Sequence, residues 1–201
     1  WVKGTGAVAA ARGRAGFARG TDAAGSGRVP AAFNGLVGVK PSRGLVSTRG
    51  VVPACRTLDC VTVMARAVAL ARRVFDVMHA YDDRDPLARR LTQVALPIGP
   101  PVIGVPQGDL ALDGAHDLAW KQAVEQAHEL GAVVPVDVTP LLEAAELLYS
   151  GPWLAERWLA FGSRMDDDPA VDPTVRAIVR RGAALTAADA FAGFGRLAEL
   201  A

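Results

Sequence analysis

The chain has 201 residues, of which 51% are hydrophobic, and its 22 basic and 21 acidic side chains leave a formal net charge of +1. This length is enough for one domain with a core, or for a large part of a bigger domain. No basic stripe interleaved with aromatic residues is present and no apolar run could span a bilayer, so we expect neither a nucleic-acid nor a membrane partner. The N-terminal segment also lacks the apolar region of a signal peptide.

The first 81 residues predict short elements joined by glycine-rich turns. Two helices are expected, one over 6–13 that a glycine ends and one within 25–35 with Pro30 in its first turn. Two strands are expected, a buried one over 15–22 and a β-branched one over 36–42 that ends near Pro41. After a loop-rich stretch, residues 60–81 have apolar side chains at helical spacing and predict a surface helix with one buried face. That face comprises Val63, Val68, Ala71, Val74, Phe75 and Met78.

Residues 100–138 predict a buried strand, an amphipathic helix that Gly131 ends, and a second strand over 132–138. This order is typical of a right-handed crossover in an α/β sheet. Residues 139–201 are predicted to be almost entirely helical, with a break at Gly151-Pro152 and with Thr186 or Asp189 as the cap of the last helix. We therefore divide the chain into an α/β portion, 1–138, and a mainly helical portion, 139–201.

The cysteines and histidines indicate no metal site. Cys55 and Cys60 are the only cysteines, too few for a disulfide scaffold, and the three histidines have no ligand spacing. We expect two reduced thiols in a cytoplasmic protein.

The stretch "GTDAAGSGRVPAAFNG", residues 20–35, surrounds Ser26 with small residues. A phosphate-binding loop would need a lysine followed by Ser or Thr, and a G-x-S-x-G elbow is absent as well. Two interpretations stay open from the residues alone. Ser26 is either the N-cap of a helix after a turn, or a nucleophile beside backbone donors from Ala23, Ala24 and Gly25.

Residues 20–44, "GTDAAGSGRVPAAFNGLVGVKPSRG", closely resemble the core of the amidase signature family, which are serine hydrolases of amides. The resemblance implies an α/β fold with a mixed central sheet flanked by helices, of which residues 1–201 would be a partial amidase domain, incomplete at both ends. It implies that Ser26 is the nucleophile and that Ala23, Ala24 and Gly25 form the oxyanion hole. Asp22 and Arg28 would brace the loop through a charged hydrogen bond. The family's hydrolysis needs no cofactor.

Two further stretches, "STRGVVPACRTLDCVTVMA" (47–65) and "LLYSGPWLAERW" (147–158), resemble the allophanate hydrolases of this family. The resemblance implies that Tyr149 and Arg157 bind the carboxylate of a small anionic amide, since arginine grips carboxylates with two N–H groups. The alternatives are a solvated Arg157 paired with Glu156 or Glu146, and a Tyr149 packed in the core. Trp153 and Trp158 are expected to be packing residues, and Asp59 a structural brace.

The N-terminal segment departs from the family pattern. A gap-free alignment from Ser26 places the family's second, cis-peptide serine at about Val2, where "WVKGTG" has no serine and Thr5 is the only hydroxyl. The family's lysine falls upstream, and Lys3 does not occupy its position. We therefore expect this chain alone to be inactive or almost inactive.

Three functions remain open at this point. The first is hydrolysis of allophanate to ammonia and carbon dioxide in urea and nitrogen metabolism. The second is hydrolysis of a neutral or aromatic amide by another amidase of the family, and the third is a degenerate, non-catalytic relative that acts as a binding module. The apolar helices after Thr139 are candidates for a homodimer surface.

Overall fold

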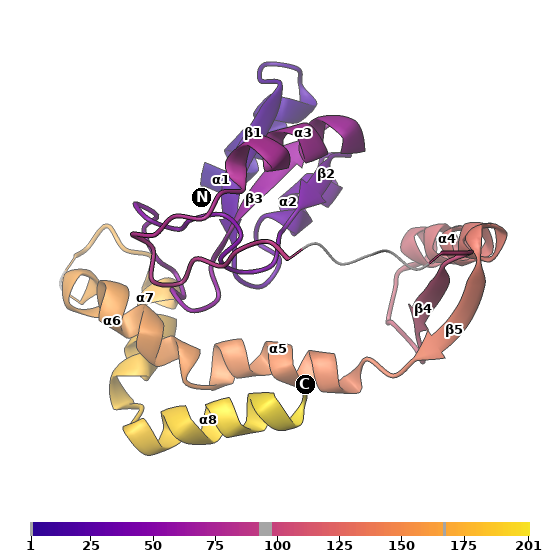
Figure 1. Ribbon diagram of the computed structural model, residues 1–201. Helices are drawn as coiled ribbons and strands as arrows, with labels where there is room; N and C mark the ends of the chain where they lie inside the picture. Colours follow the sequence, from indigo (N-terminus) through magenta and orange to yellow (C-terminus); the bar gives the residue numbers. More distant parts are fainter. Residues whose placement is uncertain (1, 93–97, 167) are drawn as a thin grey trace.

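The computed structural model describes residues 2–92, 98–166 and 168–201 (Figure 1). Its elements follow one another in both predicted portions of the chain. They are α1 (Val2–Ala11), β1 (Phe17–Asp22), α2 (Arg28–Phe33), β2 (Val37–Val39), β3 (Cys60–Ala65), α3 (Val68–Met78), β4 (Val102–Pro106), α4 (Gly114–Leu130), β5 (Ala132–Val136), α5 (Thr139–Ser150), α6 (Trp153–Met165), α7 (Pro173–Arg180), the 3-10 helix η1 (Arg181–Ala184) and α8 (Ala187–Glu199).

The first sheet has the strand order β1-β3-β2, and both of its pairs are antiparallel. Side chains alternate between the two faces of a strand, and β3 uses both faces. Met64 packs with α1 and α2 on one face, whereas Val63 and Ala65 pack with α3 on the other (Figure 1). The sheet is therefore covered by helices on both sides, and its central strand is buried.

The prediction of a helix over the whole of 60–81 is wrong for its first part. Cys60–Ala65 is strand β3, and the helix begins only at Val68. Val63 therefore lies in a strand, and Val68 is largely exposed. A strand that is buried on both faces has apolar residues at every spacing, so its pattern does not differ from that of a buried helix. In α3, Ala71, Val74 and Met78 do face the sheet as predicted.

Two strands predicted to be buried are not. In β1, Asp22 is the one fully buried residue of six, and Phe17 is exposed. In β4, Val102 is also exposed. Both lie at an edge of their sheet, where a strand has a neighbour on one side only.

The strands β4 and β5 form a second, two-stranded sheet, in which Val102 pairs with Ala132 and the strands run parallel. The helix α4 connects them, as the predicted strand–helix–strand order requires. This unit lies apart from the first sheet in Figure 1. The chain thus has antiparallel and parallel pairs, as a mixed sheet would, but in two separate small sheets of the described residues.

Helices make up most of the chain after Thr139. The predicted break falls between α5 and α6, where the Gly151 N–H still bonds the Leu147 carbonyl. The helix α8 lies along α5 (Figure 1), and Arg196 pairs with Glu143 across them. Thr186 caps α8, as predicted, in a reciprocal capping box with Asp189. No helix in the described ranges has the length and apolarity needed to cross a membrane.

Candidate active site

The loop between β1 and α2 is organised around the carboxylate of Asp22. This buried carboxylate accepts backbone N–H bonds from Gly25, Gly27 (3.1 Å) and Arg28 (3.0 Å). The Arg28 guanidinium adds two bonds, from Nε at 3.0 Å and from Nη2 at 3.2 Å. The chain must fold back tightly to bring these donors together, and Gly25 takes a positive φ of 116° in doing so.

The electrostatics of this loop favour an ionised Asp22. Burial raises the pKa of Asp22, but the Arg28 side chain and the N–H groups of Gly25, Arg28 and Gly27 together lower it, to about 2 from the ordinary value of 3.8. The same ion pair raises the pKa of Arg28. Asp22 and Arg28 therefore form the charged hydrogen-bond pair across the loop that the resemblance implied.

Gly27 anchors the loop to the sheet. A Cβ atom at this position would lie 2.5 Å from Thr62 Oγ1 and 3.2 Å from Asp22 Cβ. Both of those side chains are buried, so neither has room to move away. The close approach of the loop to β3 thus requires glycine at position 27.

Ser26 lies exposed at the tip of this loop, and its Oγ donates to the Thr21 carbonyl at 3.3 Å. It does not cap α2, because Gly27 is the N-cap residue and no side chain bonds that helix start. Within the described residues, the N–H groups of Ala23 and Ala24 have no hydrogen-bond partner, whereas the Gly25 N–H donates to Asp22. Two of the three backbone donors expected beside Ser26 are thus available to an incoming oxygen.

Tyr149 and Arg157 come together across the break between α5 and α6. The Arg157 Cζ lies 5.5 Å from the centroid of the Tyr149 ring, within the range of a cation–π interaction. Tyr149 is 54% exposed, so it is not a core residue. Arg157 forms no ion pair with a described residue, and Glu156 bonds Thr57 instead. Both structural alternatives considered for these residues are therefore absent from the described structure.

The serine loop and the arginine are linked through one buried cluster. Cys55, Leu148 and Trp153 form it, and Ala23 packs against it from the serine loop. Arg157 reaches the same cluster, since its Nε donates to Cys55 Sγ at 3.3 Å. Trp153 is thus a packing residue, as expected.

Asp59 holds the loop that carries Cys55. Its buried carboxylate accepts the N–H groups of Ala54 at 2.8 Å and Cys55 at 3.1 Å. This is the bracing role that the sequence suggested. The contact between Cys55 and Arg157 was not anticipated, although both lie in the two stretches that resemble allophanate hydrolases.

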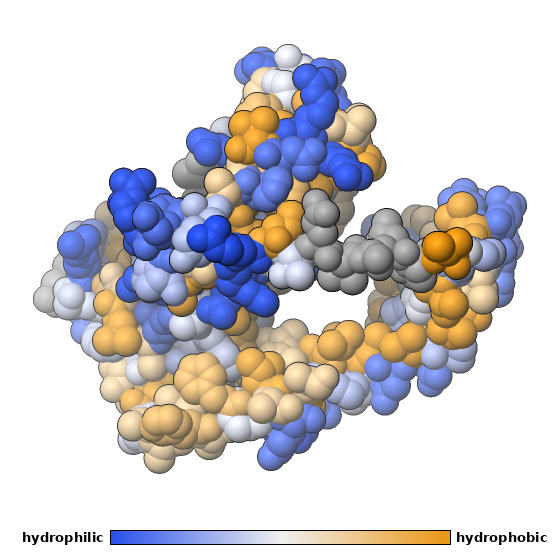
Figure 2. Space-filling view, in the orientation of Figure 1, coloured by the Kyte–Doolittle hydropathy of each residue, from blue (hydrophilic) through white to orange (hydrophobic). Residues whose placement is uncertain are grey.

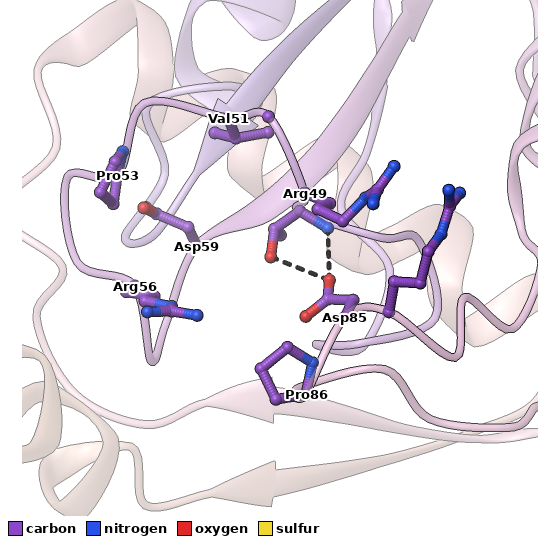
Figure 3. A pocket seen from close by; sticks show the side chains of 10 residues that line it. Arg49, Val51, Pro53, Arg56, Asp59, Asp85 and Pro86 are labelled. Atoms are coloured by element: carbon purple, nitrogen blue, oxygen red, sulfur yellow. Dashed lines mark hydrogen bonds between the residues drawn. The ribbon is translucent and has the colours of Figure 1, made fainter.

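Two cavities adjoin this loop. One of about 280 Å³ is lined by residues 48–59 and 84–86 but not by Ser26 or Arg157 (Figure 3). At its wall Asp85 accepts both the N–H and the hydroxyl of Thr48, which ties the two loops together. The other, of about 410 Å³, is apolar apart from Arg157, which lies at its wall with Ala54, Phe161 and Val179. In the described ranges, no three His, Cys, Asp or Glu side chains converge as a metal site would need.

Comparison with known proteins defines the class first. A protein-family model described as Amidase matches residues 4–184, so the chain belongs to the amidase family. Among curated proteins, it is 39% identical over 197 residues to a urea amidolyase of Saccharomyces cerevisiae and 41% identical over 194 residues to one of Lachancea kluyveri. These matches cover 90% and 92% of this chain but 10% of each relative.

Among solved structures, the chain matches an allophanate hydrolase variant of Kluyveromyces lactis with a TM-score of 0.90 and 35% identity. That match covers 96% of this chain and 33% of the other, so the chain spans about a third of the solved enzyme and about a tenth of the curated relatives. The predicted amidase-signature fold is therefore confirmed for this part of the family's domain.

Proposed function

We propose that this chain carries the nucleophile loop and the carboxylate-binding arginine of an amidohydrolase that acts on allophanate. The proposal depends on one arrangement. The Arg157 guanidinium lies over Tyr149 without a carboxylate partner in the described structure, and the Ser26 loop packs through Ala23 on the cluster that Arg157 contacts. Similarity to the K. lactis allophanate hydrolase and to the urea amidolyases supports the same substrate.

The reaction would use the two ends of this arrangement. Ser26 Oγ attacks the amide carbonyl and gives up its proton, and the N–H groups of Ala23 and Ala24 bind the oxygen on which negative charge develops. One such donor contributes roughly 3 kcal/mol to lowering the barrier. Ammonia leaves with a proton, water hydrolyses the acyl-enzyme, and the carbamate product loses carbon dioxide spontaneously. Arg157 and Tyr149 would hold the carboxylate while this occurs.

We further propose that the 201-residue chain turns over slowly, if at all. No serine occurs among residues 1–25, so this segment does not supply the second serine of the family triad. Members of such a triad act as a unit, and losing one removes several orders of magnitude of rate. Ammonia release from allophanate should be compared for the chain and for Ser26→Ala. Turnover that this variant abolishes would contradict the inactivity while supporting the nucleophile.

Binding tests the substrate independently of turnover. Malonate, a small dicarboxylate, should bind the chain in a calorimeter, and Arg157→Met should weaken it at least tenfold, since hydrogen bonds to a charged group contribute about 1.5–3 kcal/mol. Exposed Arg164 on the same helix gives a control, Arg164→Met, that should bind as the unaltered chain does. Equal binding by both variants would reject the carboxylate clamp.

The apolar cavity beside Arg157 supports a second candidate, an amidase for a neutral or aromatic amide. Such an enzyme would not need the guanidinium, so Arg157→Met would bind a neutral amide such as benzamide at least as well as the unaltered chain. A non-catalytic binding module would instead bind malonate without any turnover, even when the rest of the family triad is supplied.

We also propose a cytoplasmic homodimer formed through α5 and α8. Apolar side chains gather along these helices in Figure 2, among them Leu141, Leu142, Phe191 and Phe194, all at least half exposed. The two free cysteines fit a reducing compartment. Sedimentation equilibrium of the chain and of a Leu142→Lys variant would test the dimer, which the lysine should dissociate.

A further inference from the structure

The loop 54–59 contacts α6 through one face of that helix. The Thr57 N–H and hydroxyl donate to the two carboxylate oxygens of Glu156, at 2.9 and 2.8 Å. Trp153 Nε1 donates back to the Thr57 hydroxyl at 3.1 Å, and Arg157 Nε donates to Cys55 Sγ at 3.3 Å. Trp153, Glu156 and Arg157 are three and four positions apart, so they share the helix face turned to the loop.

The loop itself is a rigid support for these contacts. Asp59 accepts the N–H groups of Ala54 and Cys55, and the N–H groups of Leu58 and Asp59 return to the Cys55 carbonyl. Cys55 has no exposed surface. Its sulfur is therefore a fixed acceptor, about a hundred residues away in sequence from the arginine that it meets.

The protonation state of Cys55 suits this role. Burial raises the pKa of its thiol, and the nearby Arg157 lowers it by less, so the group stays a neutral thiol. The S–H lies 3.7 Å from the Trp153 carbonyl as a donor. A sulfur lone pair is then left to accept the Arg157 Nε–H.

We propose that Cys55 is a positioning residue for Arg157, and that loop 54–59 thereby sets the preference of the site for anionic amides. This inference rests on the proposed function, because it assigns a purpose to the guanidinium. An arginine has five N–H donors in a rigid plane. With Nε held by Cys55 and the plane held over Tyr149, the outer Nη groups face a carboxylate in one orientation. A guanidinium without this support would have to be ordered when the substrate binds.

Matched variants test the contact. Cys55→Ala removes the acceptor and Cys55→Ser replaces it with an oxygen of nearly the same side-chain volume as alanine. Thr57→Val and Thr57→Ser form a second pair, which removes or keeps the hydroxyl that bonds Glu156. Thermal unfolding of each variant establishes the temperature at which all are folded, and the other measurements are made below it.

Two measurements separate positioning from general stability. The first is the malonate dissociation constant by calorimetry, expected to rise about three- to tenfold in Cys55→Ala, as for freeing one long side chain, and to recover most of the way in Cys55→Ser. The second is hydrogen exchange of the Arg157 Nε–H by nitrogen-15 NMR, assigned with Arg157→Lys. It should be slow in the unaltered chain, fast in Cys55→Ala and slow again in Cys55→Ser.

The outcomes distinguish this inference from the proposed function. If Arg157→Met loses malonate but Cys55→Ala binds it as the unaltered chain does, the function stands and the positioning role is rejected. Unchanged Nε–H exchange in Cys55→Ala rejects it as well. If Arg157→Met binds malonate normally, the proposed function fails, and the exchange data then show separately whether Cys55 holds the guanidinium.

Discussion

Replacing Asp22 by asparagine should unfold the serine loop more readily than any other single conservative change in it. The carboxylate accepts bonds from Gly25, Gly27 and Arg28, all on its two oxygens. An asparagine has one acceptor oxygen and an amide that can only donate. The amide would therefore face N–H groups, and the Arg28 guanidinium would lose its charged partner.

The pKa of Asp22 sets the size of the effect. Each tenfold change in a dissociation constant corresponds to about 1.4 kcal/mol. Lowering the pKa from 3.8 to about 2 thus corresponds to roughly 2.5 kcal/mol of stability. Since the folded-state pKa is below the unfolded one, this contribution is complete above about pH 5, and about half of it is lost by pH 3 as acid protonates the unfolded chain first.

Urea unfolding at pH 7 and at pH 3 would measure it. Asp22→Asn should lower the free energy of unfolding by about 2–4 kcal/mol at pH 7, and the difference from the unaltered chain should shrink at pH 3. Asp83→Asn, at an exposed carboxylate, makes the same change in charge and should cost less than 0.5 kcal/mol. A difference for Asp22→Asn that is equal at both pH values would show that the charge is not what stabilises the loop.

Two further stability predictions follow from the geometry. Gly27→Ala should cost about 2 kcal/mol or more in urea unfolding, because its Cβ would lie 2.5 Å from the buried Thr62 Oγ1; Gly4→Ala, in a helix with no atom within 4 Å, should be neutral or stabilise by up to about 1 kcal/mol, and equal effects of the two changes would reject the close packing of the loop on β3. Thr186→Ala should cost about 1 kcal/mol through loss of the capping box of α8, and Thr186→Ser should restore most of it; if Ser and Ala cost the same, the hydroxyl is not the stabilising group.

Local pattern alone predicted much of the architecture. The helices after Thr139, the break at Gly151-Pro152 and the cap at Thr186 follow from periodicity and from the chemistry of glycine, proline and threonine, which act within a few residues. The order of β4, α4 and β5 likewise predicted a parallel pair. Motif resemblance, rather than periodicity, identified the amidase family and pointed to Asp22 and Arg28.

Tertiary packing decided what local pattern could not. Residues 60–65 are a strand because helices cover both faces of β3, and burial on both faces erases the alternation that distinguishes strand from helix. The partner of Arg157 was also beyond local reasoning. Glu156 is adjacent in sequence, but Thr57 takes its carboxylate, and the guanidinium turns to Cys55. Such contacts depend on how distant segments pack, so only the folded chain determines which groups a charged side chain meets.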